Sequence, residues 1–377
     1  MQAGIYIHIP FCIKKCIYCD FYSIPNREND IERFTNALIC EIESTDLSSI
    51  KEWRFTTIYF GGGTPSLLEQ PYLDKILNAL HRTFNLSDVT EITIEANPGE
   101  APLQRLKAYR NLGINRLSIG FQTFQPDLLR FLSRIHTAED CFSTFANAEK
   151  ARFTNINVDM IFNIPKQTAD IWRDDLKTAI QLNPTHISAY SLTVERGTPL
   201  HQQVVTHSVH MPDEDTDIRM FTETREILQN AGYSAYEISN FAKPGFECRH
   251  NLGYWKLQPY LGFGPSSHSY DLKRRCWKYS SLDTYLKALE KNESTVEGNE
   301  VITENDRFNE LVFNGLRMKQ GINLHQLSEW FSGDFENYLE KVSLKWKELT
   351  IQNNYLMLTE EGTLLADEIA ADLFITD

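Results

Sequence analysis

The chain has 377 residues, of which 42% are hydrophobic and 23% are charged, a composition of folded globular proteins rather than disordered ones. Its 51 acidic and 37 basic side chains leave a net charge of −14, which argues against a general affinity for nucleic acid or for anionic membrane. A strand-like pattern begins almost at Met1, no apolar run is long enough to span a membrane, and seven cysteines suit a reducing compartment, so we expect a cytoplasmic protein without a targeting peptide or integral membrane segment.

The first predicted strand, residues 5–9, leads into three closely spaced cysteines, Cys12, Cys16 and Cys19. Thiolates with the spacing C-x3-C-x2-C can converge only if the chain wraps around a centre, and cubane iron–sulfur clusters are held by such thiolates. Three ligands leave one iron of a four-iron cluster open to a small molecule. A zinc site would need a fourth ligand at matching spacing, and no neighbouring residue completes such a pattern. The remaining alternative is a group of buried or free cysteines.

The second predicted strand, residues 56–60, ends in three glycines at 61–63, followed by Thr64 and Pro65. Glycine lets the backbone approach a ligand closely, and free amides and carbonyls at a strand end can bind an ammonium and a carboxylate. Most glycine triplets are ordinary turns. This one follows the next strong strand after the cysteines, and that position favours a ligand site.

Strand-like and helix-like segments alternate from residue 4 to about residue 230. Apolar spacing predicts helices over 73–84, 103–112, 138–151 and 171–182, and strands over 91–95, 116–121, 157–162 and 186–191. Repeated βα units imply a parallel sheet with right-handed crossovers, and six units are too few for the eight-fold barrel. In such a sheet the functional side chains collect where strands end. At or just after strands stand the cysteines, the glycines, Glu95, Gln122 and Asp159.

The character of the sequence changes after residue 240. Residues 241–270 are rich in glycine, proline, aromatic residues and histidine, and they show no helical period, so we expect an irregular surface segment. Helical patterns return at residue 303, and a short strand or wing at 356–362 leads to a last helix. This small module is winged-helix-like, and its apolar stripes indicate core rather than a nucleic-acid recognition face.

We therefore expect an α/β protein with three parts. Residues 1–235 form the core, residues 236–300 form an extension that packs on the core, and residues 301–377 form a C-terminal helical domain.

The cysteine loop and the glycine triplet together resemble those of the radical S-adenosylmethionine (SAM) enzymes, whose defining signature is this loop. The resemblance implies a [4Fe-4S] cluster on the three cysteines, SAM at the open iron, and an open partial (β/α)6 barrel. The phrases at residues 6–12 and 250–269 resemble the oxygen-independent coproporphyrinogen III oxidase group over essentially the whole chain. Within that group, the phrase His-Asn-x-x-Tyr-Trp at 250–255 is similar to the HemW-type haem chaperones.

The family's SAM contacts can be carried over residue by residue. A carboxylate can bind ribose hydroxyls or an ammonium, and a guanidinium fits a carboxylate. The matching positions here are Tyr6, Tyr18, Gly62, Gly63, Thr64, Glu95, Gln122, Arg134 and Asp159. Arg134 has the alternative of a surface charge on a helix, and Ala189 and His268 match SAM-contacting positions more loosely.

The oxidases carry a further cysteine two residues after the third cluster ligand, where this chain has Phe21. This departure argues against decarboxylation of porphyrinogen propionates and favours the chaperone branch. The resemblance thus implies a protein that binds the cluster, SAM and haem, and that delivers haem to respiratory membrane proteins while peripheral to the inner membrane. An electron donor is a further expected partner. The alternatives are a coproporphyrinogen oxidase and a different radical SAM enzyme with a small substrate.

For haem, His250 is the first candidate, because imidazole is a common axial ligand. Tyr254 and Trp255 could line or stack on the macrocycle. His250 could equally be a hydrogen-bonded structural histidine in a tight loop. Cys248 and His268 are the next candidate ligands.

Overall fold

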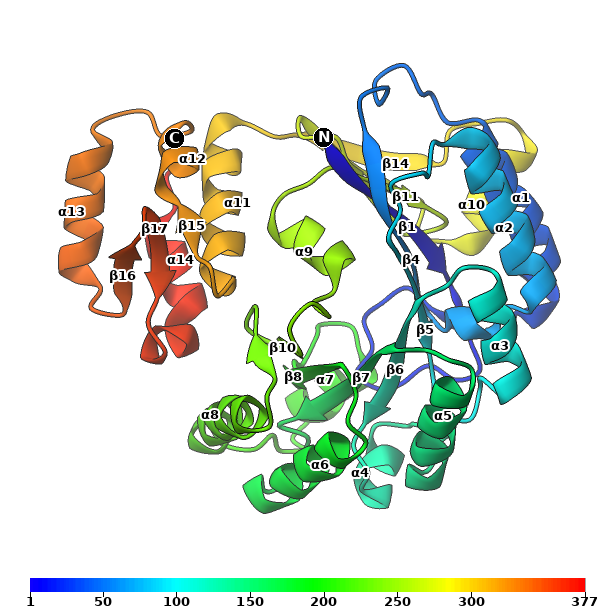
Figure 1. Ribbon diagram of the computed structural model, residues 1–377, viewed down its shortest axis with the longest axis horizontal. Coiled ribbons are helices and arrows are strands. Elements are labelled where there is room, and N and C mark those ends of the chain that lie inside the picture. The colour runs from blue at the N-terminus through cyan, green and yellow to red at the C-terminus, as the bar shows by residue number, and fades with distance from the viewer. Residues whose placement is uncertain (377) are drawn as a thin grey trace.

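Six parallel strands form the centre of the fold. The structure, a computed structural model, describes residues 1–376. In spatial order the strands are β1 (Gln2–Ile9), β4 (Arg54–Gly62), β5 (Glu91–Ala96), β6 (Arg116–Gln122), β7 (Asn155–Phe162) and β8 (His186–Ser191). Their order in space follows their order in the chain, and the sheet curves into an open barrel (Figure 1). The expected partial (β/α)6 barrel is confirmed.

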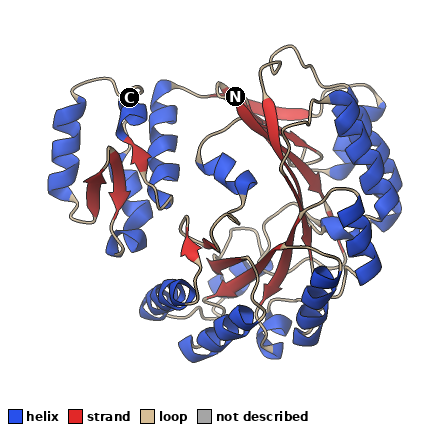
Figure 2. Ribbon diagram, viewed as in Figure 1, coloured by secondary structure: helices blue, strands red, loops and turns tan. Residues whose placement is uncertain are grey.

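Helices cover the convex side of the curved sheet (Figure 2). Side-chain caps fix where several of them begin; Thr137, for example, forms a capping box with Asp140 at the start of α5. The helices predicted from apolar spacing match the observed ones within about three residues. The helices of the barrel are α1 (Ile31–Glu43), α2 (Gln70–Thr83), α3 (Leu103–Asn111), α4 (Pro126–Phe131), α5 (Ala138–Lys150), α6 (Ala169–Gln181), α7 (Pro199–Val205) and α8 (Glu214–Asn230), with short 3-10 turns η1 (Glu28–Asp30) and η2 (Pro65–Leu67).

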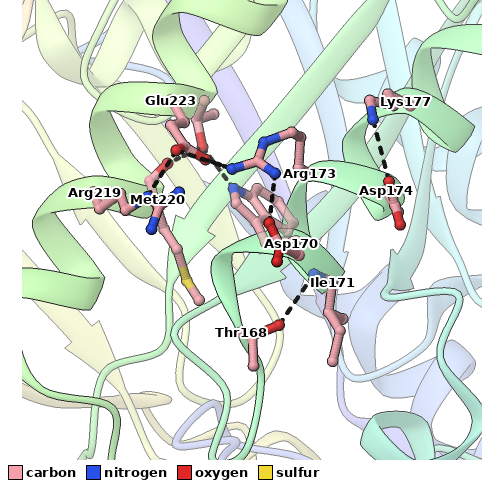
Figure 3. Close-up of polar contacts among 11 residues, drawn as sticks. Thr168, Asp170, Ile171, Arg173, Asp174, Lys177, Arg219, Met220 and Glu223 are labelled. Carbon is pink, nitrogen blue, oxygen red and sulfur yellow. Dashed lines mark hydrogen bonds and ion pairs between the residues drawn. The ribbon is translucent and has the colours of Figure 1, made fainter.

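The pair α6 and α8 shows how these outer helices are joined (Figure 3). Arg173 of α6 donates to both carboxylate oxygens of Glu223 of α8, at 3.1 and 3.0 Å. Beneath this partly exposed ion pair the indole of Trp172 is fully buried and donates to Thr224 at 2.8 Å. Because surface ion pairs contribute little to stability, the buried indole is the stronger link between the two helices.

The segment after α8 extends the sheet at both of its edges. β10 (Asn240–Ala242) is antiparallel to β8, and β9 (Ser234–Ala235) is antiparallel to β10. At the other edge β11 (Tyr260–Phe263) is parallel to β1, and β12 (His268–Tyr270), β13 (Arg274–Lys278) and β14 (Val296–Val301) follow antiparallel. Helix α10 (Leu282–Glu290) connects β13 to β14 and packs on α1. One sheet of 12 strands results.

Helix α9 (Arg249–Trp255) lies between the two edge extensions, and it corrects the expectation of an irregular surface segment over residues 241–270. A helix of seven residues is too short to show a periodic stripe. Its N-terminus is held inside the barrel by the buried carboxylate of Glu91, which accepts from the amides of Arg249 and His250 at 3.0 Å each. A carboxylate at this position compensates the unpaired amides and the positive end of the helix.

The C-terminal domain is built around a second apolar core, to which Leu257 and Tyr270 of the preceding segment also contribute. Its elements are α11 (Glu304–Arg317), β15 (Ile322–Asn323), α12 (Leu324–Ser328), α13 (Phe335–Lys345), β16 (Leu349–Gln352), β17 (Tyr355–Leu358), the 3-10 turn η3 (Glu361–Leu365) and α14 (Ala366–Leu373). β15, β17 and β16 form one small sheet, and the hairpin of β16 and β17 gives the expected wing. Among residues 1–376 no helix is long and apolar enough to cross a membrane.

We predict that Glu91→Ala lowers the free energy of unfolding by about 3–5 kcal/mol, because it leaves Arg116, also buried, without its nearby carboxylate and uncaps α9. Urea denaturation followed by circular dichroism measures the change. The matched control is Glu149→Ala, at an exposed position near the end of α5, which should change stability by less than about 0.5 kcal/mol. Equal stabilities of the two variants would contradict the anchoring role.

Candidate functional site

The three cysteines lie in one loop at the carboxyl end of β1. The short parallel strands β2 (Phe11–Cys12) and β3 (Ile24–Pro25) close this loop at its base, and the amide of Ile24 donates to the carbonyl of Pro10 at 2.8 Å. Within the loop the amide of Cys19 donates to the carbonyl of Cys16 at 3.3 Å. All three cysteines are free and half-buried, so their thiols remain available to a ligand.

Three side chains from three further segments connect two of these sulfurs. Thr64 Oγ1 donates to Cys12 Sγ at 3.5 Å, and Asn97 Nδ2 donates to Thr64 Oγ1 at 2.9 Å. Arg134 donates through Nη2 to Asn97 Oδ1 at 2.5 Å and through Nη1 to Cys16 Sγ at 3.6 Å. We call Thr64, Asn97 and Arg134 the polar arc. Asn97 is not among the site residues predicted from the sequence, although it directly follows the strand that carries Glu95.

Arg134 is not a solvated charge on a helix, the alternative considered above. It follows the end of α4 and is half-buried, and its guanidinium also donates to the carbonyl of Gly120 at 2.8 Å. A cation bonded to a sulfur favours the thiolate form that metals require.

The donor set fits a multi-iron cluster better than a single metal ion. Within residues 1–376 no three His, Cys, Asp or Glu side chains are grouped closely enough to hold one metal ion. A four-iron cluster does not need such a group, because its cysteine ligands bind different irons. Burial raises the pKa of the Cys12 thiol, and burial with the nearby Cys16 raises that of Cys19, so these two thiols resist ionisation unless a positive charge lies beside them.

The glycines at the end of β4 are required first by the cysteine loop itself. The amide of Gly63 donates to the carbonyl of Ile9 at 2.8 Å, and that of Thr64 to the carbonyl of Phe11 at 2.7 Å. A Cβ atom on Gly63 would lie 2.6 Å from the Phe11 oxygen, which is closer than real Cβ contacts. Gly62 has φ +114°, a conformation that favours glycine. The sequence predicted that the glycines let the backbone come close to a ligand. In the structure they also let the end of β4 pack closely against the backbone of the cysteine loop.

Glu95 joins the glycines to the interior of the barrel. Its Oε1 accepts from the Tyr59 hydroxyl at 2.7 Å, and its Oε2 from the amide of Gly62 at 3.2 Å. Burial raises the pKa of Glu95 to about 7, so both the neutral and charged forms are present near neutral pH. Tyr6 lies beside it, with its ring stacked on Tyr59 at a centroid distance of 6.2 Å and its hydroxyl 3.1 Å from His8 Nδ1.

The other expected SAM contacts lie around this centre at different depths. Gln122 is buried at the end of β6 with φ +68°, a left-handed conformation typical of strained functional positions. Tyr18 packs against the apolar cluster that contains Leu128 and Leu132. Asp159 lies deeper, within β7, where it accepts from Ser118 at 3.0 Å and from Asn157 at 2.8 Å, and burial raises its pKa.

The two residues that match SAM-contacting positions only loosely, Ala189 and His268, lie in different parts of the sheet. Ala189 is buried within β8. His268 is exposed on β12 in the edge extension of the sheet.

His250 is a buried side chain with a partner on each ring nitrogen. Nδ1 lies 2.8 Å from Thr57 Oγ1 and Nε2 lies 2.9 Å from the Tyr254 hydroxyl, while the ring stacks on Tyr59 at 5.0 Å. Burial lowers the pKa of His250 to about 3, so the ring is neutral. Our expectation that this residue lies in a surface loop is wrong, because it belongs to α9. Cys248 is buried too, with Sγ 3.7 Å from Glu91 Oε1.

Tyr254 and Trp255, from the last turn of α9, line a cavity of about 560 Å³. Its lining comes from α9, the ends of β8 and β10, and α11 of the C-terminal domain. The structure thus separates the residues singled out for haem into two that line a cavity and one, His250, that lies behind them.

Known proteins share this fold and these segments. Residues 6–179 match the radical SAM superfamily, and residues 302–365 match the HemN C-terminal domain. The heme chaperone HemW of Bacillus subtilis is 32% identical over 98% of both chains, and that of Buchnera aphidicola from Schizaphis graminum is 41% identical over 70% of this chain and 69% of its own. The solved structure of coproporphyrinogen III oxidase (HemN) from Escherichia coli has a TM-score of 0.83 at 22% identity, covering 99% of this chain and 90% of its own.

We predict that Glu95 makes stability depend on pH. Its pKa of about 7 in the folded protein exceeds the ordinary 4.5, so its contribution is fully present below about pH 4.5 and is lost as pH rises through 7. Between pH 5 and 8, cluster-free Glu95→Gln should therefore gain roughly 3 kcal/mol of unfolding free energy relative to the unsubstituted protein. Urea denaturation at each pH measures this difference, with Glu149→Gln as control. Parallel profiles for all three proteins would contradict the raised pKa.

Proposed function

Because this chain belongs to the radical SAM superfamily, in the group that includes the HemW-type haem chaperones, we propose that it is a haem chaperone that also binds a [4Fe-4S] cluster and SAM. The observation that carries the proposal is the match to a haem chaperone over 98% of both chains. The match includes the cysteine loop, the barrel, α9 and the C-terminal domain, so it does not rest on one shared domain.

Cys12, Cys16 and Cys19 would hold the cluster, and the polar arc would orient two of their sulfurs. When bound, the cluster and SAM would supply one-electron chemistry. The amides and carbonyls of Gly62, Gly63 and Thr64 would bind the amino-acid part of SAM. Glu95 would accept from an ammonium or from ribose hydroxyls, and its bonds to Tyr59 and Gly62 keep the carboxylate pointing along the end of β4.

The remaining proposed contacts with SAM come from the surrounding strand ends. Tyr6 and Tyr18 would shield the cluster and the methionine end from water. Gln122, Arg134 and Asp159 would bind polar groups of SAM, with Arg134 doing so in addition to its contact with Cys16.

Phe21 favours the chaperone over the oxidase. It stands where the oxidases carry their further cysteine, and its side chain is 66% exposed beside the cluster loop. No thiol is therefore supplied at this position. A coproporphyrinogen oxidase remains the second candidate, supported by the likeness in fold to HemN.

We further propose that the protein delivers haem to respiratory acceptor proteins, lying at the periphery of the membrane while it does so, and that an electron donor reduces the cluster. The word chaperone in the relatives' names supports a recipient for the cargo. We propose that haem binds near Tyr254 and Trp255, and that His250, the first residue of the same motif, belongs to this site.

We predict that Cys12→Ala, Cys16→Ala and Cys19→Ala each remove most of the iron bound after anaerobic reconstitution, while circular dichroism stays that of the folded barrel. The loop lies on the rim, outside the sheet interior, so the fold should persist. Cys40→Ala and Cys276→Ala are matched controls outside this loop and should keep the iron. Iron content near that of the unsubstituted protein in any of the three loop variants would overturn the ligand assignment.

Haem titration of the reconstituted protein tests the function. We expect a saturable change in haem absorbance and no conversion of coproporphyrinogen III to protoporphyrinogen under anaerobic, reducing conditions with SAM. Turnover of coproporphyrinogen would establish the oxidase instead. Cleavage of SAM without haem binding would indicate a different radical SAM enzyme.

A further inference from the structure

The cavity beside α9 is built from both domains. The barrel contributes Tyr254 and Trp255 of α9 together with Asn240 of β10, and the C-terminal domain contributes Asn314 and Arg317 of α11. Its volume, about 560 Å³, lies within the range of roughly 300–1,000 Å³ found for sites that bind small molecules and cofactors. Neither domain alone would enclose it.

Buried polar atoms at this cavity lack partners. Asn240 Oδ1 and the Tyr270 hydroxyl are both buried, both side chains line the cavity, and neither atom has a hydrogen-bond partner within residues 1–376. A buried polar group left unpaired lowers the stability of the fold. A ligand with polar groups at its edge could form hydrogen bonds with these two atoms. A purely apolar cavity would give such a ligand no hydrogen-bond partner.

Arg317 supplies a cation that a ligand can recruit. Its side chain is 10% exposed, and its ion-pair partner Asp367 is 82% exposed. Arg317 also donates through Nη1 to the carbonyl of Phe313 at 2.7 Å, so a carboxylate of a ligand would compete only with the solvent-exposed Asp367 and could leave that second bond in place. The other cavity arginine, Arg275, is held by both Glu300 and Glu310 at 2.7 Å and is not free in this way.

A chain of hydrogen bonds through Thr57, His250 and Tyr254 holds the tyrosine in place at the side of the cavity. Thr57 of β4 contacts His250 Nδ1, and His250 Nε2 contacts the Tyr254 hydroxyl. These hydrogen bonds run from the barrel interior to the cavity, and His250 itself is not among the residues that line it. His250 therefore stands one side chain behind the cavity wall.

We propose that this interdomain cavity is where haem binds, with the macrocycle against Tyr254 and Trp255, a propionate on Arg317, and His250 as a positioning residue for Tyr254. This inference rests on the proposed function. It adds that the cavity between the two domains holds the haem, that Arg317 binds a propionate, and that His250 positions Tyr254. The C-terminal domain would then contribute one wall of the haem site.

The main test blocks the cavity from the C-terminal domain. Asn314→Trp adds bulk on the cavity side of α11, and Glu304→Trp adds the same residue at the exposed start of that helix, outside the cavity lining. In the reconstituted protein, Asn314→Trp should weaken haem binding at least about tenfold, and Glu304→Trp should leave it within about twofold. Iron content and SAM binding should be unchanged in both, which verifies folding.

Two further variants test the propionate contact and the positioning role. Arg317→Gln should weaken the binding of haem but not that of haem dimethyl ester, which lacks free carboxylates. His250→Ala should weaken haem binding without moving the haem absorbance band, and His250→Gln, which can still bond Tyr254, should restore affinity.

The outcomes separate this proposal from the function on which it rests. Haem binding that Asn314→Trp leaves intact, or an equal loss of haem and its ester in Arg317→Gln, overturns the cavity as the site. A shifted band in both His250 variants makes His250 an iron ligand and overturns its positioning role. A protein that binds no haem before any substitution would instead refute the haem chaperone itself.

Discussion

The close approach of the end of β4 to the cysteine loop is the constraint on which the candidate site depends. β1 and β4 are parallel neighbours, so the segments that follow them emerge side by side, and backbone hydrogen bonds from Gly63 to Ile9 and from Thr64 to Phe11 join them. Only glycine fits at position 63, because any side chain would meet the Phe11 carbonyl. Thr64 is thereby placed against Cys12, and the polar arc can extend from it to Cys16 through Asn97 and Arg134.

A second organising group lies inside the barrel, where a carboxylate of the central sheet holds α9. Glu91 accepts from two amides at the start of this helix, and its charge lies near the buried Arg116. The segment containing α9 leaves one edge of the sheet at β10 and joins the opposite edge at β11, so the helix must cross the open side of the barrel. That crossing brings Tyr254 and Trp255 to the cavity shared with α11.

One buried aromatic group connects the two candidate sites. Tyr59 donates to Glu95 on the side of the glycines, and its ring stacks on His250, which contacts Tyr254 beside the cavity. Close-packed side chains of this kind transmit small displacements because they have no room to relax independently. The SAM contacts and the haem contacts proposed here therefore share a wall, although they face different ligands and come from different parts of the chain.

The sequence by itself determined the alternation of six strands with outer helices, the winged C-terminal module, and the strand ends at which the cysteines, the glycines and Glu95 stand. These are local patterns, set by apolar periodicity and turn chemistry within a few residues. Only the tertiary structure decided the rest. α9 is too short and too buried to show a helical period. Asn97 connects Thr64 to Arg134 only because the ends of neighbouring strands meet in the fold. Glu91 caps a helix more than 150 residues away. The state of His250 depends on Thr57, 193 residues distant, because whether a ring nitrogen is free or bonded is a property of contacts between strands and helices that no local pattern encodes.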